Sequence, residues 1–376
     1  MAAKPMNILH VFRAPVGGLF RHVVDLARGQ IARGHRVGLI ADSRTGGERA
    51  EEALAALAPQ LALGLTRLPM HRQLNPGDAI AAWHVTRRIT QAGADVVHGH
   101  GAKGGAYARL AFAQQSVVRA YTPHGGSLLF GHNTLAGKIY LTLERILMRR
   151  GDLFLFESAY SRDIFNAKIG SPGGIVRVVH NGVSKAEFEP VALVPDATDI
   201  VFMGELRHVK GIDVLIEAIG QLRQDGRKLS ATLVGSGPDE TALRAQVTRL
   251  GLDAAIRFMP AMAARSAFAL GGVMTVPSRA ESLPYAVLES VAAAKPLVTT
   301  SVGGIPEIYG PLSDALVPAE NPQALAKALV RTLDDPAAAK ALAEQLRARV
   351  AAQFSVDVMV EGVLAAYAEA IGQKVV

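Results

Sequence analysis

Residues 8–34, ILHVFRAPVGGLFRHVVDLARGQIARG, run from a short apolar segment through a glycine pair into a helical pattern that ends at Gly34. The apolar segment, Ile8 to Phe12, has the length of one buried strand. The helical pattern, Leu19 to Arg33, has an apolar face (Phe20, Val23, Val24, Ala27 and Ile31) and a charged face (Arg21, Asp25 and Arg28). Such a helix packs on a sheet, so the stretch predicts one strand-loop-helix unit of an α/β fold.

The same alternation of apolar runs and helical patterns continues along the chain and predicts two parallel sheets. The further runs of the first set are 37–41, 95–98, 117–121, 153–156 and 176–179. The second set is 199–203, 231–234, 256–258, 273–276, 297–300 and 315–317. Residues 189–198 contain two prolines and no helical period, so we expect a linker there.

The predicted fold class is therefore α/β, with two Rossmann-like domains whose parallel sheets face each other across a cleft. The length of 376 residues supports two domains, because a single core stops growing at about 250–300 residues. We expect a first domain at 1–188 and a second at 189–355. The final helix, within 356–376, follows the second sheet and is expected to pack back onto the first domain.

The composition excludes several classes of protein. With 49% hydrophobic and 19% charged residues, the chain is neither disordered, collagenous nor a coiled coil. The absence of cysteine removes disulfides, thiolate nucleophiles and cysteine-based zinc sites, and fits a reducing compartment. The first twelve residues do not resemble a secretory signal, and no apolar stretch approaches the ~20 residues of a membrane span. We therefore expect a cytoplasmic protein.

The net charge of +7 is unevenly distributed. Residues 1–185 contain 23 Lys and Arg against 11 Asp and Glu, a net charge of +12; the remainder contains 17 against 22, a net charge of −5. A basic face attracts nucleic acid, anionic lipid headgroups or acidic small molecules, and charge alone does not choose among them. We favour a lipid phosphate.

Two loops between a strand and a helix are suited to phosphate. Gly17 and Gly18 open the first helix, where backbone N–H groups and the positive helix end favour an anion, although a glycine there also serves the turn alone. After the strand 199–203, the loop from Gly204 to Gly211 carries Arg207 and Lys210, which can converge on a diphosphate or remain solvated surface cations.

Two glutamates flank a third loop. Glu281 follows the strand 273–276, and Glu289 is expected in the first turn of the next helix. Both carboxylates then face the crevice at the carboxyl ends of the strands, where they accept hydrogen bonds from the hydroxyls of a sugar and a ribose. Taken alone, a glutamate at each end of a loop is usually solvated.

Together with three glycine-containing motifs, these residues resemble a known family. Glu281 and Glu289 in E-x7-E spacing, Arg207 and Lys210 in G-x-L-x-x-x-K-G, the run 235–238 (GSGP), 181–183 (NGV) and 303–307 (GGIPE) stand in that family's order. The chain thus resembles the retaining glycosyltransferases of family 4, which have the GT-B fold. The resemblance covers the whole chain and is strongest from Asn181 to Glu307.

The resemblance implies roles for individual residues. Arg207 and Lys210 would neutralise the donor diphosphate, Glu281 would bind donor-sugar hydroxyls, and Glu289 the nucleotide ribose. His124 matches a first-domain histidine that contacts the donor sugar, so the catalytic candidates are His124, Arg207, Lys210 and Glu281. The donor-binding candidates are Gly17, Gly18, Asn181, Gly204, Gly235, Gly237, Ser282, Leu283, Pro284 and Glu289.

No cofactor and no metal are expected. Cations and backbone amides would stabilise the departing nucleoside diphosphate, and the sequence has no D-x-D metal motif. The resemblance implies front-face attack, with the leaving phosphate helping to deprotonate the acceptor. Leu283, Pro284, Lys295 and Pro260 depart from the residues usual in the family, which leaves the nucleotide and donor sugar open.

Ten of the eleven histidines lie in the first half of the chain. His98 and His100, at i and i+2 of a strand, lie on one face and suggest a metal, but no cysteine or nearby acidic residue supplies a third ligand. We expect instead a polar role at the acceptor site, or hydrogen bonding at the strand end. His98, His100 and Lys103 are the acceptor-side candidates.

The helical pattern 135–150 combines apolar residues with Lys138, Arg145, Arg149 and Arg150. Such a basic amphipathic helix lies on an anionic membrane, or packs on a core with its basic side in solvent. Because the resembling bacterial enzymes commonly act on sugars linked to polyprenyl diphosphate, we favour peripheral contact with the inner face of the plasma membrane.

The sequence thus predicts a retaining glycosyltransferase. It would transfer a hexose or N-acetylhexosamine from a UDP-sugar, or next a GDP-sugar, to a lipid-linked glycan in envelope or exopolysaccharide assembly. The alternatives are a nucleotide-sugar epimerase or phosphorylase on the same scaffold, or a non-catalytic nucleic-acid-binding or anion-binding protein. One tryptophan and few aromatic residues near the cations argue against nucleic acid.

Overall fold

A computed structural model describes residues 4–129, 131 and 133–375, which form two compact units. The first unit runs to Gly182 and includes the C-terminal helix α14 (Val356–Val375); the second is Val183–Ser355. The chain passes from the first unit to the second after Gly182, before the boundary expected at residue 188. The boundary lies there because Val183 packs in the second unit, where its backbone N–H donates to the Phe354 carbonyl (2.8 Å).

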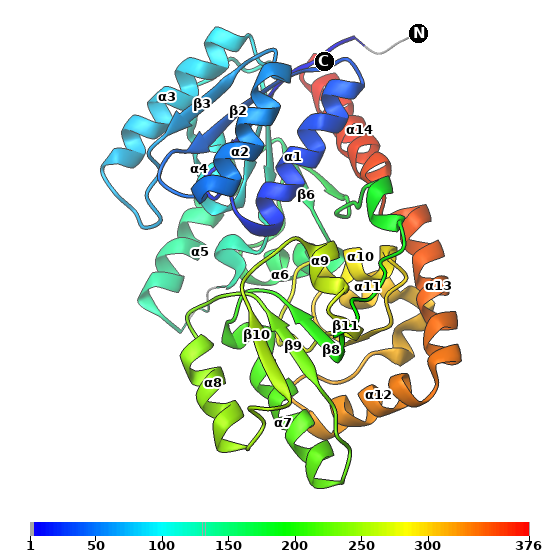
Figure 1. Ribbon diagram of the computed structural model, residues 1–376. Helices are drawn as coiled ribbons and strands as arrows, with labels where there is room; N and C mark the ends of the chain where they lie inside the picture. The colour runs from blue at the N-terminus through cyan, green and yellow to red at the C-terminus, as the bar shows by residue number, and fades with distance from the viewer. Residues whose placement is uncertain (1–3, 130, 132, 376) are drawn as a thin grey trace. The chain divides into compact units, whose positions relative to one another are not determined.

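The first unit contains a seven-stranded parallel sheet in the order β3-β2-β1-β4-β5-β6-β7 (Figure 1). The strands are β1 (Asn7–Phe12), β2 (Arg36–Asp42), β3 (Leu65–Leu68), β4 (Val96–His100), β5 (Val118–Thr122), β6 (Leu153–Phe156) and β7 (Ile175–Val178). Six of them match the expected apolar runs. The sequence analysis missed β3, a short edge strand in which only Leu68 is buried.

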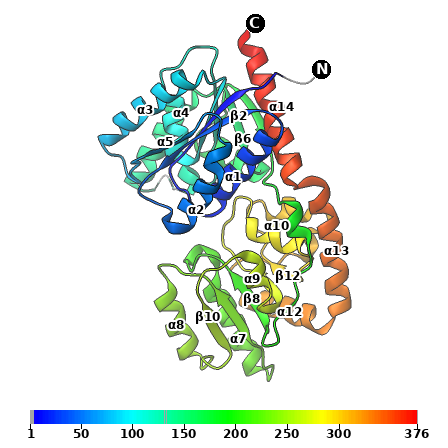
Figure 2. The ribbon, with the colours of Figure 1, turned by 45° about the horizontal axis from the view of Figure 1, so that its top comes forward.

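Helices cover both faces of this sheet. On the face to which Ile8 points lie α1 (Gly17–Ala32), α2 (Gly47–Leu57) and α14. On the face to which Leu9 points lie α3 (Gly77–Ala92), α4 (Gly101–Leu110), α5 (Leu135–Met148) and α6 (Ala159–Lys168). Helix α14 runs beside α1 (Figures 1 and 2), and its Met359, Val360 and Val363 complete the core over β5 and β6.

The second unit contains a five-stranded parallel sheet in the order β10-β9-β8-β11-β12. The strands are β8 (Thr198–Met203), β9 (Ala231–Val234), β10 (Ile256–Met259), β11 (Gly271–Val276) and β12 (Leu297–Thr299). The expected strand at 315–317 is wrong: Ala315 ends a 3-10 turn, and Val317 forms an isolated bridge with Thr300. A single bridge does not extend the sheet.

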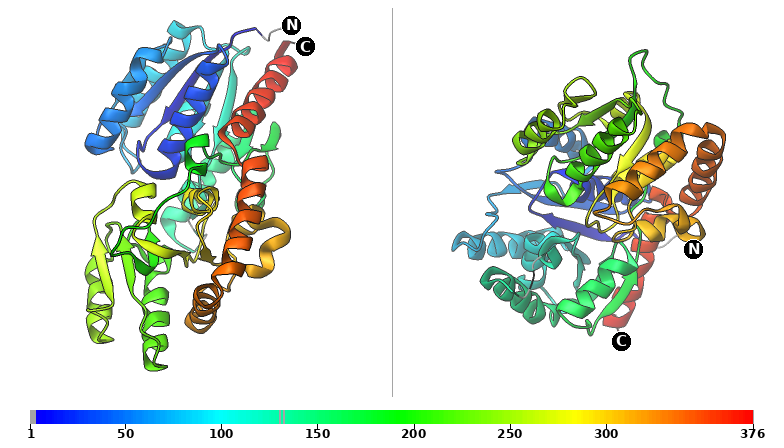
Figure 3. Two further views of the ribbon diagram at one scale, coloured as in Figure 1. Left: turned by 45° about the vertical axis from the view of Figure 1, so that its right-hand side comes forward. Right: turned by 90° about the horizontal axis from the view of Figure 1, so that it is seen from below.

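Helices again cover both faces, as the two views of Figure 3 show. One layer contains α7 (Ile212–Gln224), α8 (Glu240–Arg249) and α12 (Pro322–Asp334). The other contains α9 (Ala264–Phe268), α10 (Tyr285–Ala292), α11 (Ile305–Tyr309) and α13 (Pro336–Gln353). The strand order reverses direction between β1 and β4 in the first sheet, and between β8 and β11 in the second. Ligands of such sheets bind at the carboxyl ends of these strand pairs.

A buried ion pair attaches α5 to α4 in the first unit. Arg109 Nη2 donates to Glu144 Oε2 (2.9 Å), and the Tyr121 hydroxyl donates to Glu144 Oε1 (2.9 Å). The Arg109 side chain is fully buried, with its guanidinium 3.8 Å from the centre of the Tyr121 ring. Each charge depends on its partner, because an unpaired charge in this interior is costly.

We expect Glu144→Gln to lower the free energy of unfolding by about 3–5 kcal/mol, because it leaves the Arg109 charge buried without a counterion. The Arg109→Met/Glu144→Leu double variant removes both charges and should lose less. Asp163→Asn, in the exposed pair Arg162–Asp163 (2.8 Å), is the control and should cost under about 1 kcal/mol. Urea unfolding measures all three, and equal losses for Glu144→Gln and Asp163→Asn would contradict the argument.

Candidate functional site

In the second unit, the loops that follow β8 and β11 bring a lysine and a glutamate together. Lys210 Nζ donates to Glu281 Oε1 at 2.7 Å, and Ser278 Oγ donates to the same oxygen at 2.7 Å. The ammonium has three donor hydrogens, so further hydrogen bonds to an anion remain open to it. Arg207 stands nearby in the sequence with its side chain 45% exposed and only a 3.5 Å contact to Glu205.

An arginine to which the sequence analysis assigned no role connects these loops. Arg279 forms a bidentate ion pair with Asp213, with both N···O distances at 2.7 Å, and Nη1 also donates to the His208 carbonyl at 2.5 Å. The hydrogen bonds that Arg279 donates to the carboxylates of Asp213 and Glu320 raise its pKa. The pair fixes the start of α7 against the loop after β11, and therefore positions Lys210 relative to Glu281.

A glycine holds the main chain at Glu281. Gly303 has a φ of +60°, and a Cβ on it would lie 1.7 Å from the Glu281 carbonyl oxygen. The next residue, Gly304, donates its N–H to the Ser282 carbonyl at 2.8 Å. No residue with a side chain fits there, so the 303–304 glycine pair sets the position of the Glu281 loop.

The remaining donor-binding candidates of the second unit lie around the same strand ends. Gly204 follows β8, Gly235 and Gly237 follow β9, and Ser282, Leu283 and Pro284 lead into α10. The expected position of Glu289 in the first turn of a helix is wrong. Because α10 begins at Tyr285, Glu289 is in its second turn, and the first turn has no acidic residue.

In the first unit, five histidines gather where β1, β4 and β5 end. His10 lies opposite His98 in the parallel register of β1 and β4, and His100 is two residues further along β4. His22 reaches the group from α1, and His124 from the loop after β5. His22 and His124 have ring centres 4.7 Å apart, and those of His98 and His100 are 3.9 Å apart.

Hydrogen bonds fix the tautomers of this histidine cluster, defined as His10, His22, His98, His100 and His124. Gln30 Oε1 accepts from His10 Nε2 (2.8 Å), so His10 Nδ1 accepts from His100 Nε2 (2.9 Å). His100 Nδ1 then accepts from His124 Nε2 (3.1 Å). His124 therefore donates to His100, His100 donates to His10, and His10 donates to Gln30.

Burial keeps the cluster neutral. It lowers the pKa of His10 to about 4 and those of His22 and His124 to about 3, and it lowers the pKa of His98 and His100 well below the usual value. The neighbouring imidazoles lower the pKa of His22, His98 and His100 further. At neutral pH the cluster offers hydrogen-bonding nitrogens without positive charge.

A cavity of about 940 Å³ opens beside the cluster. Its polar wall includes His100, His124, Arg13, Arg72 and Lys103. Its apolar wall includes Leu19, Leu74, Ile139, Tyr140, Leu143 and Leu147, four of which come from α5. The cavity thus joins cations to an apolar surface.

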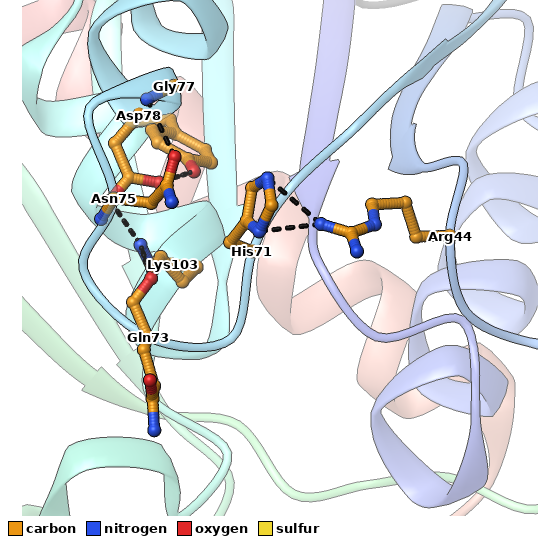
Figure 4. Close-up of polar contacts among 8 residues, drawn as sticks. Arg44, His71, Gln73, Asn75, Gly77, Asp78 and Lys103 are labelled. Atoms are coloured by element: carbon orange, nitrogen blue, oxygen red, sulfur yellow. Dashed lines mark hydrogen bonds and ion pairs between the residues drawn. The ribbon is translucent and has the colours of Figure 1, made fainter.

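Lys103 is held at the edge of this cavity (Figure 4). Its ammonium donates to the Gln73 carbonyl (3.0 Å) and to Asp78, which also accepts from the Tyr107 hydroxyl (2.6 Å). Burial alone would raise the pKa of Asp78, but hydrogen bonds, first those from Lys103 and Tyr107, bring it below its usual value. Asp78 therefore stays ionised and fixes the lysine beside the loop 71–77.

Helix α5 ends at Met148 rather than Arg150. Ile139, Leu143 and Leu147 line the cavity, and Ile139 and Ile146 are 42% and 57% exposed. Among the described residues, no helix is both long and apolar enough to cross a bilayer.

Not all of the remaining first-unit candidates line the cavity. Gly17 and Gly18 are exposed at the start of α1. Asn181 is buried, and its Oδ1 accepts from His22 Nδ1 at 3.0 Å. His98 is fully buried, with Nδ1 bonded to the Tyr367 hydroxyl (2.6 Å) and Nε2 to Thr122 Oγ1 (2.8 Å), and it does not line the cavity. Of the acceptor-side candidates, His100 and Lys103 do.

The sequence analysis missed His10, His22 and Gln30. Their signal was the burial pattern: His10 is in the apolar run of β1, and His22 and Gln30 are on the sheet-facing side of α1 with Val23, Leu26 and Ala27. A polar residue at a core position requires a hydrogen-bond partner: His10 and Gln30 bond each other, and His22 Nδ1 donates to Asn181.

Comparisons with known proteins identify the family. Residues 16–187 match the family described as Glycosyltransferase Family 4, and residues 197–335 match Glycosyl transferases group 1. The chain therefore belongs to the family 4, group 1 glycosyltransferases. The predicted family and the prediction of an enzyme are both confirmed.

The glycosyltransferase has relatives along most of its length. It is 26% identical over 367 residues to the glycogen synthase of Mycobacterium tuberculosis, covering 90% of this chain and 88% of that protein. It is 32% identical to the D-inositol 3-phosphate glycosyltransferase of Salinispora arenicola, covering 52% and 50%. The crystal structure of Anabaena Alr3699/HepE in complex with UDP superposes with a TM-score of 0.78 at 18% identity, covering 97% and 100%. The likeness confirms the GT-B fold class.

The histidine cluster should make the stability of this glycosyltransferase depend on pH. Because the pKa of each histidine is lower in the folded than in the unfolded state, the unfolded state binds more protons as the pH falls below about 6.5. Each cluster histidine should then remove up to about 1.4 kcal/mol of unfolding free energy per pH unit, in the window from 6.5 toward 3–4.

Urea unfolding between pH 5.0 and 7.5 tests this, followed by the fluorescence of Trp83, the only tryptophan, on α3 of the first unit. His10→Gln should reduce the slope by up to about 1.4 kcal/mol per pH unit, whereas His84→Gln, outside the cluster, should not. A stability that does not change between pH 6.5 and 5.0 would show that the cluster accepts protons in the folded state.

Proposed function

We propose that this glycosyltransferase transfers a hexose or N-acetylhexosamine, with retention, from a UDP-sugar to a lipid-linked glycan acceptor. The observation that carries the donor half is the Lys210–Glu281 contact of 2.7 Å at the ends of β8 and β11, three residues after Arg207 in the sequence. A cation suited to a diphosphate beside a carboxylate suited to sugar hydroxyls supports this half of the proposal. UDP is favoured over GDP because the superposed Anabaena structure contains it.

In the proposed reaction, residues of the second unit stabilise the negative charge that develops as the glycosidic bond breaks. The leaving β-phosphate gains negative charge, which Arg207 and Lys210 stabilise with charge-assisted hydrogen bonds. Glu281 accepts from donor-sugar hydroxyls, and Glu289 from the ribose. The leaving phosphate takes the acceptor proton, so we propose that the transfer step requires no metal and no cofactor.

The acceptor proposal rests on the cavity of the first unit. Arg13, Arg72 and Lys103 suit a phosphate, and Ile139 and Leu143 suit an apolar chain. A soluble sugar phosphate would use the cations but leave the apolar wall in contact with water. A polyprenyl-diphosphate-linked glycan uses both, which supports a role in envelope or exopolysaccharide assembly and peripheral contact with the inner face of the membrane through α5. Nucleic acid is not a proposed partner.

The donor site is tested by thermal unfolding with UDP, GDP and their sugars, without metal. UDP should raise the unfolding midpoint, because a ligand at 100 times its Kd adds about 2.7 kcal/mol. Arg207→Ala and Glu289→Ala should weaken binding by roughly 10- to 100-fold each, the loss of a hydrogen bond worth about 1.5–3 kcal/mol. Arg249→Ala, an exposed cation on α8, is the matched control. Stabilisation by no nucleotide in a folded sample would overturn the proposed donor site.

The acceptor is tested by comparing a polyprenyl-diphosphate-linked sugar with the same sugar phosphate lacking the lipid. Ile139 lines the cavity and is 42% exposed, so a bound lipid chain would cover it. Ile139→Gln should raise KM for the lipid-linked acceptor about tenfold and leave KM for the lipid-free one unchanged, because apolar surface removed from water is worth about 25 cal/mol per Å². Ile146→Gln, exposed on the same helix, should leave both KM values unchanged in detergent but reduce sedimentation with anionic vesicles. Equal KM values for both acceptors in the unaltered enzyme would remove the lipid from the proposal.

A further inference from the structure

We propose that His22, His100 and His124 of the first unit form a binding site for a divalent transition metal, with Zn²⁺ as the first candidate. Their candidate ligand nitrogens all lie within 4.8 Å of one another. The site goes beyond the proposed function, in which sugar transfer uses no metal. The sequence shows no third ligand near His98 and His100, so no metal is expected there from sequence; the fold supplies His22 from α1 and His124 from the loop after β5.

The first argument is an unpartnered nitrogen. His22 is 2% exposed, and Nδ1 donates to Asn181 Oδ1 (3.0 Å), so Nε2 carries a lone pair. This Nε2 is buried and has no hydrogen-bond partner among the residues that the structure describes. A buried polar atom without a partner is costly, and a metal ion would bind it directly.

The second argument is the geometry of the three rings. Tetrahedral Zn²⁺ with Zn–N bonds of about 2.0–2.1 Å requires N···N separations of roughly 3.3 Å and ring centres roughly 5 Å apart. His100 Nδ1 and His124 Nε2 are 3.1 Å apart, and the three pairs of ring centres are 4.7, 5.4 and 5.6 Å apart. Small rotations of the side chains complete the site.

The third argument is the support behind the rings. Histidine ligands usually donate their second N–H to a carbonyl or another acceptor, which orients the ring. His22 Nδ1 donates to Asn181, and His100 Nε2 donates to His10, which donates in turn to Gln30. His100 Nδ1 already carries a lone pair, and His124 becomes a ligand by moving its proton from Nε2 to Nδ1.

His124 also has an unusual backbone. Its φ of +50° is in the left-handed region, which residues other than glycine seldom occupy, and it is followed by two glycines with positive φ. That conformation turns the imidazole toward His22 and His100. His100 and His124 line the cavity and His22 does not, so the fourth metal position faces the cavity and remains for water.

The neighbouring triad, His10, His98 and His100, is not the proposed site although its nitrogens are equally close. Both nitrogens of His98 and both of His10 already have hydrogen-bond partners. A metal there would have to replace these bonds, whereas a metal at His22, His100 and His124 replaces one bond and satisfies an unpaired nitrogen.

The test is titration of the tag-free full-length protein, stripped with a chelator, with Zn²⁺ by calorimetry and with Co²⁺ by visible absorption. We expect one equivalent of Zn²⁺ and the intense bands of tetrahedral Co²⁺. His22→Asn keeps a donor to Asn181 but removes Nε2, and His100→Gln keeps a donor to His10 but removes Nδ1. Each should weaken binding by more than the 10- to 100-fold that loss of a supporting partner costs.

His98→Asn is the matched control, at a buried histidine outside the proposed triad, and should still bind one equivalent. Circular dichroism and thermal unfolding without metal show that each variant is folded. Absence of stoichiometric binding by the folded unaltered protein overturns the proposal. So does unchanged binding in His22→Asn, or loss of binding in His98→Asn alone, which would assign the metal to the other triad. None of these readouts depends on sugar transfer.

Discussion

Close contact between main chains near the carboxyl ends of the strands constrains both candidate sites. In the second unit, Gly303 lies so close to the Glu281 carbonyl that a Cβ would stand 1.7 Å from it. In the first unit, Gly104 of α4 lies so close to β1 that a Cβ would stand 2.2 Å from the Val11 carbonyl. Backbones in such contact leave little freedom of movement, because the contacting atoms belong to the main chain and cannot adjust as a side chain can. Lys103 on α4 and Lys210 in the loop after β8 are accordingly held in ion pairs.

The parts of the fold that sequence predicts are those that depend on local pattern. Apolar runs bounded by loops located six of the seven strands of the first sheet and all five of the second, because buried parallel strands are nearly continuously apolar. The edge strand β3 was missed because three of its four residues are only half-buried. The run 315–317 was wrongly predicted as a strand because a short apolar run also occurs in a segment that packs on the core without joining a sheet.

The histidine cluster shows what local pattern cannot supply. His98 and His100 stand together in the sequence, but the partners that define their chemistry come from β1, α1 and the loop after β5. The parallel register that sets His10 opposite His98 joins residues separated by two strands, three α-helices and one 3-10 helix. The Arg279–Asp213 pair is a similar case, since a bidentate contact between two loops depends on how closely those loops approach. The sequence identifies the types of residue at a site, whereas the register of the strands and the approach of the loops determine which residues become partners.

The Lys210–Glu281 site of the second unit and the histidine cluster of the first hold their polar groups by different physics. In the second, Lys210, Arg279 and their carboxylates are ionised partners at the rim of the sheet, where partial exposure limits the cost of desolvation. In the first, the histidines are buried too deeply for charge, and burial lowers their pKa until hydrogen bonds between neutral rings are the favourable arrangement. A neutral imidazole can bind a metal or accept a hydrogen bond, whereas an imidazolium can do neither. The cavity therefore has cations at Arg13 and Lys103 and uncharged imidazoles at His100 and His124. His124 Nε2 can bind a metal or donate to a sugar hydroxyl, but not both, so Zn²⁺ and a donor sugar at this nitrogen would exclude each other.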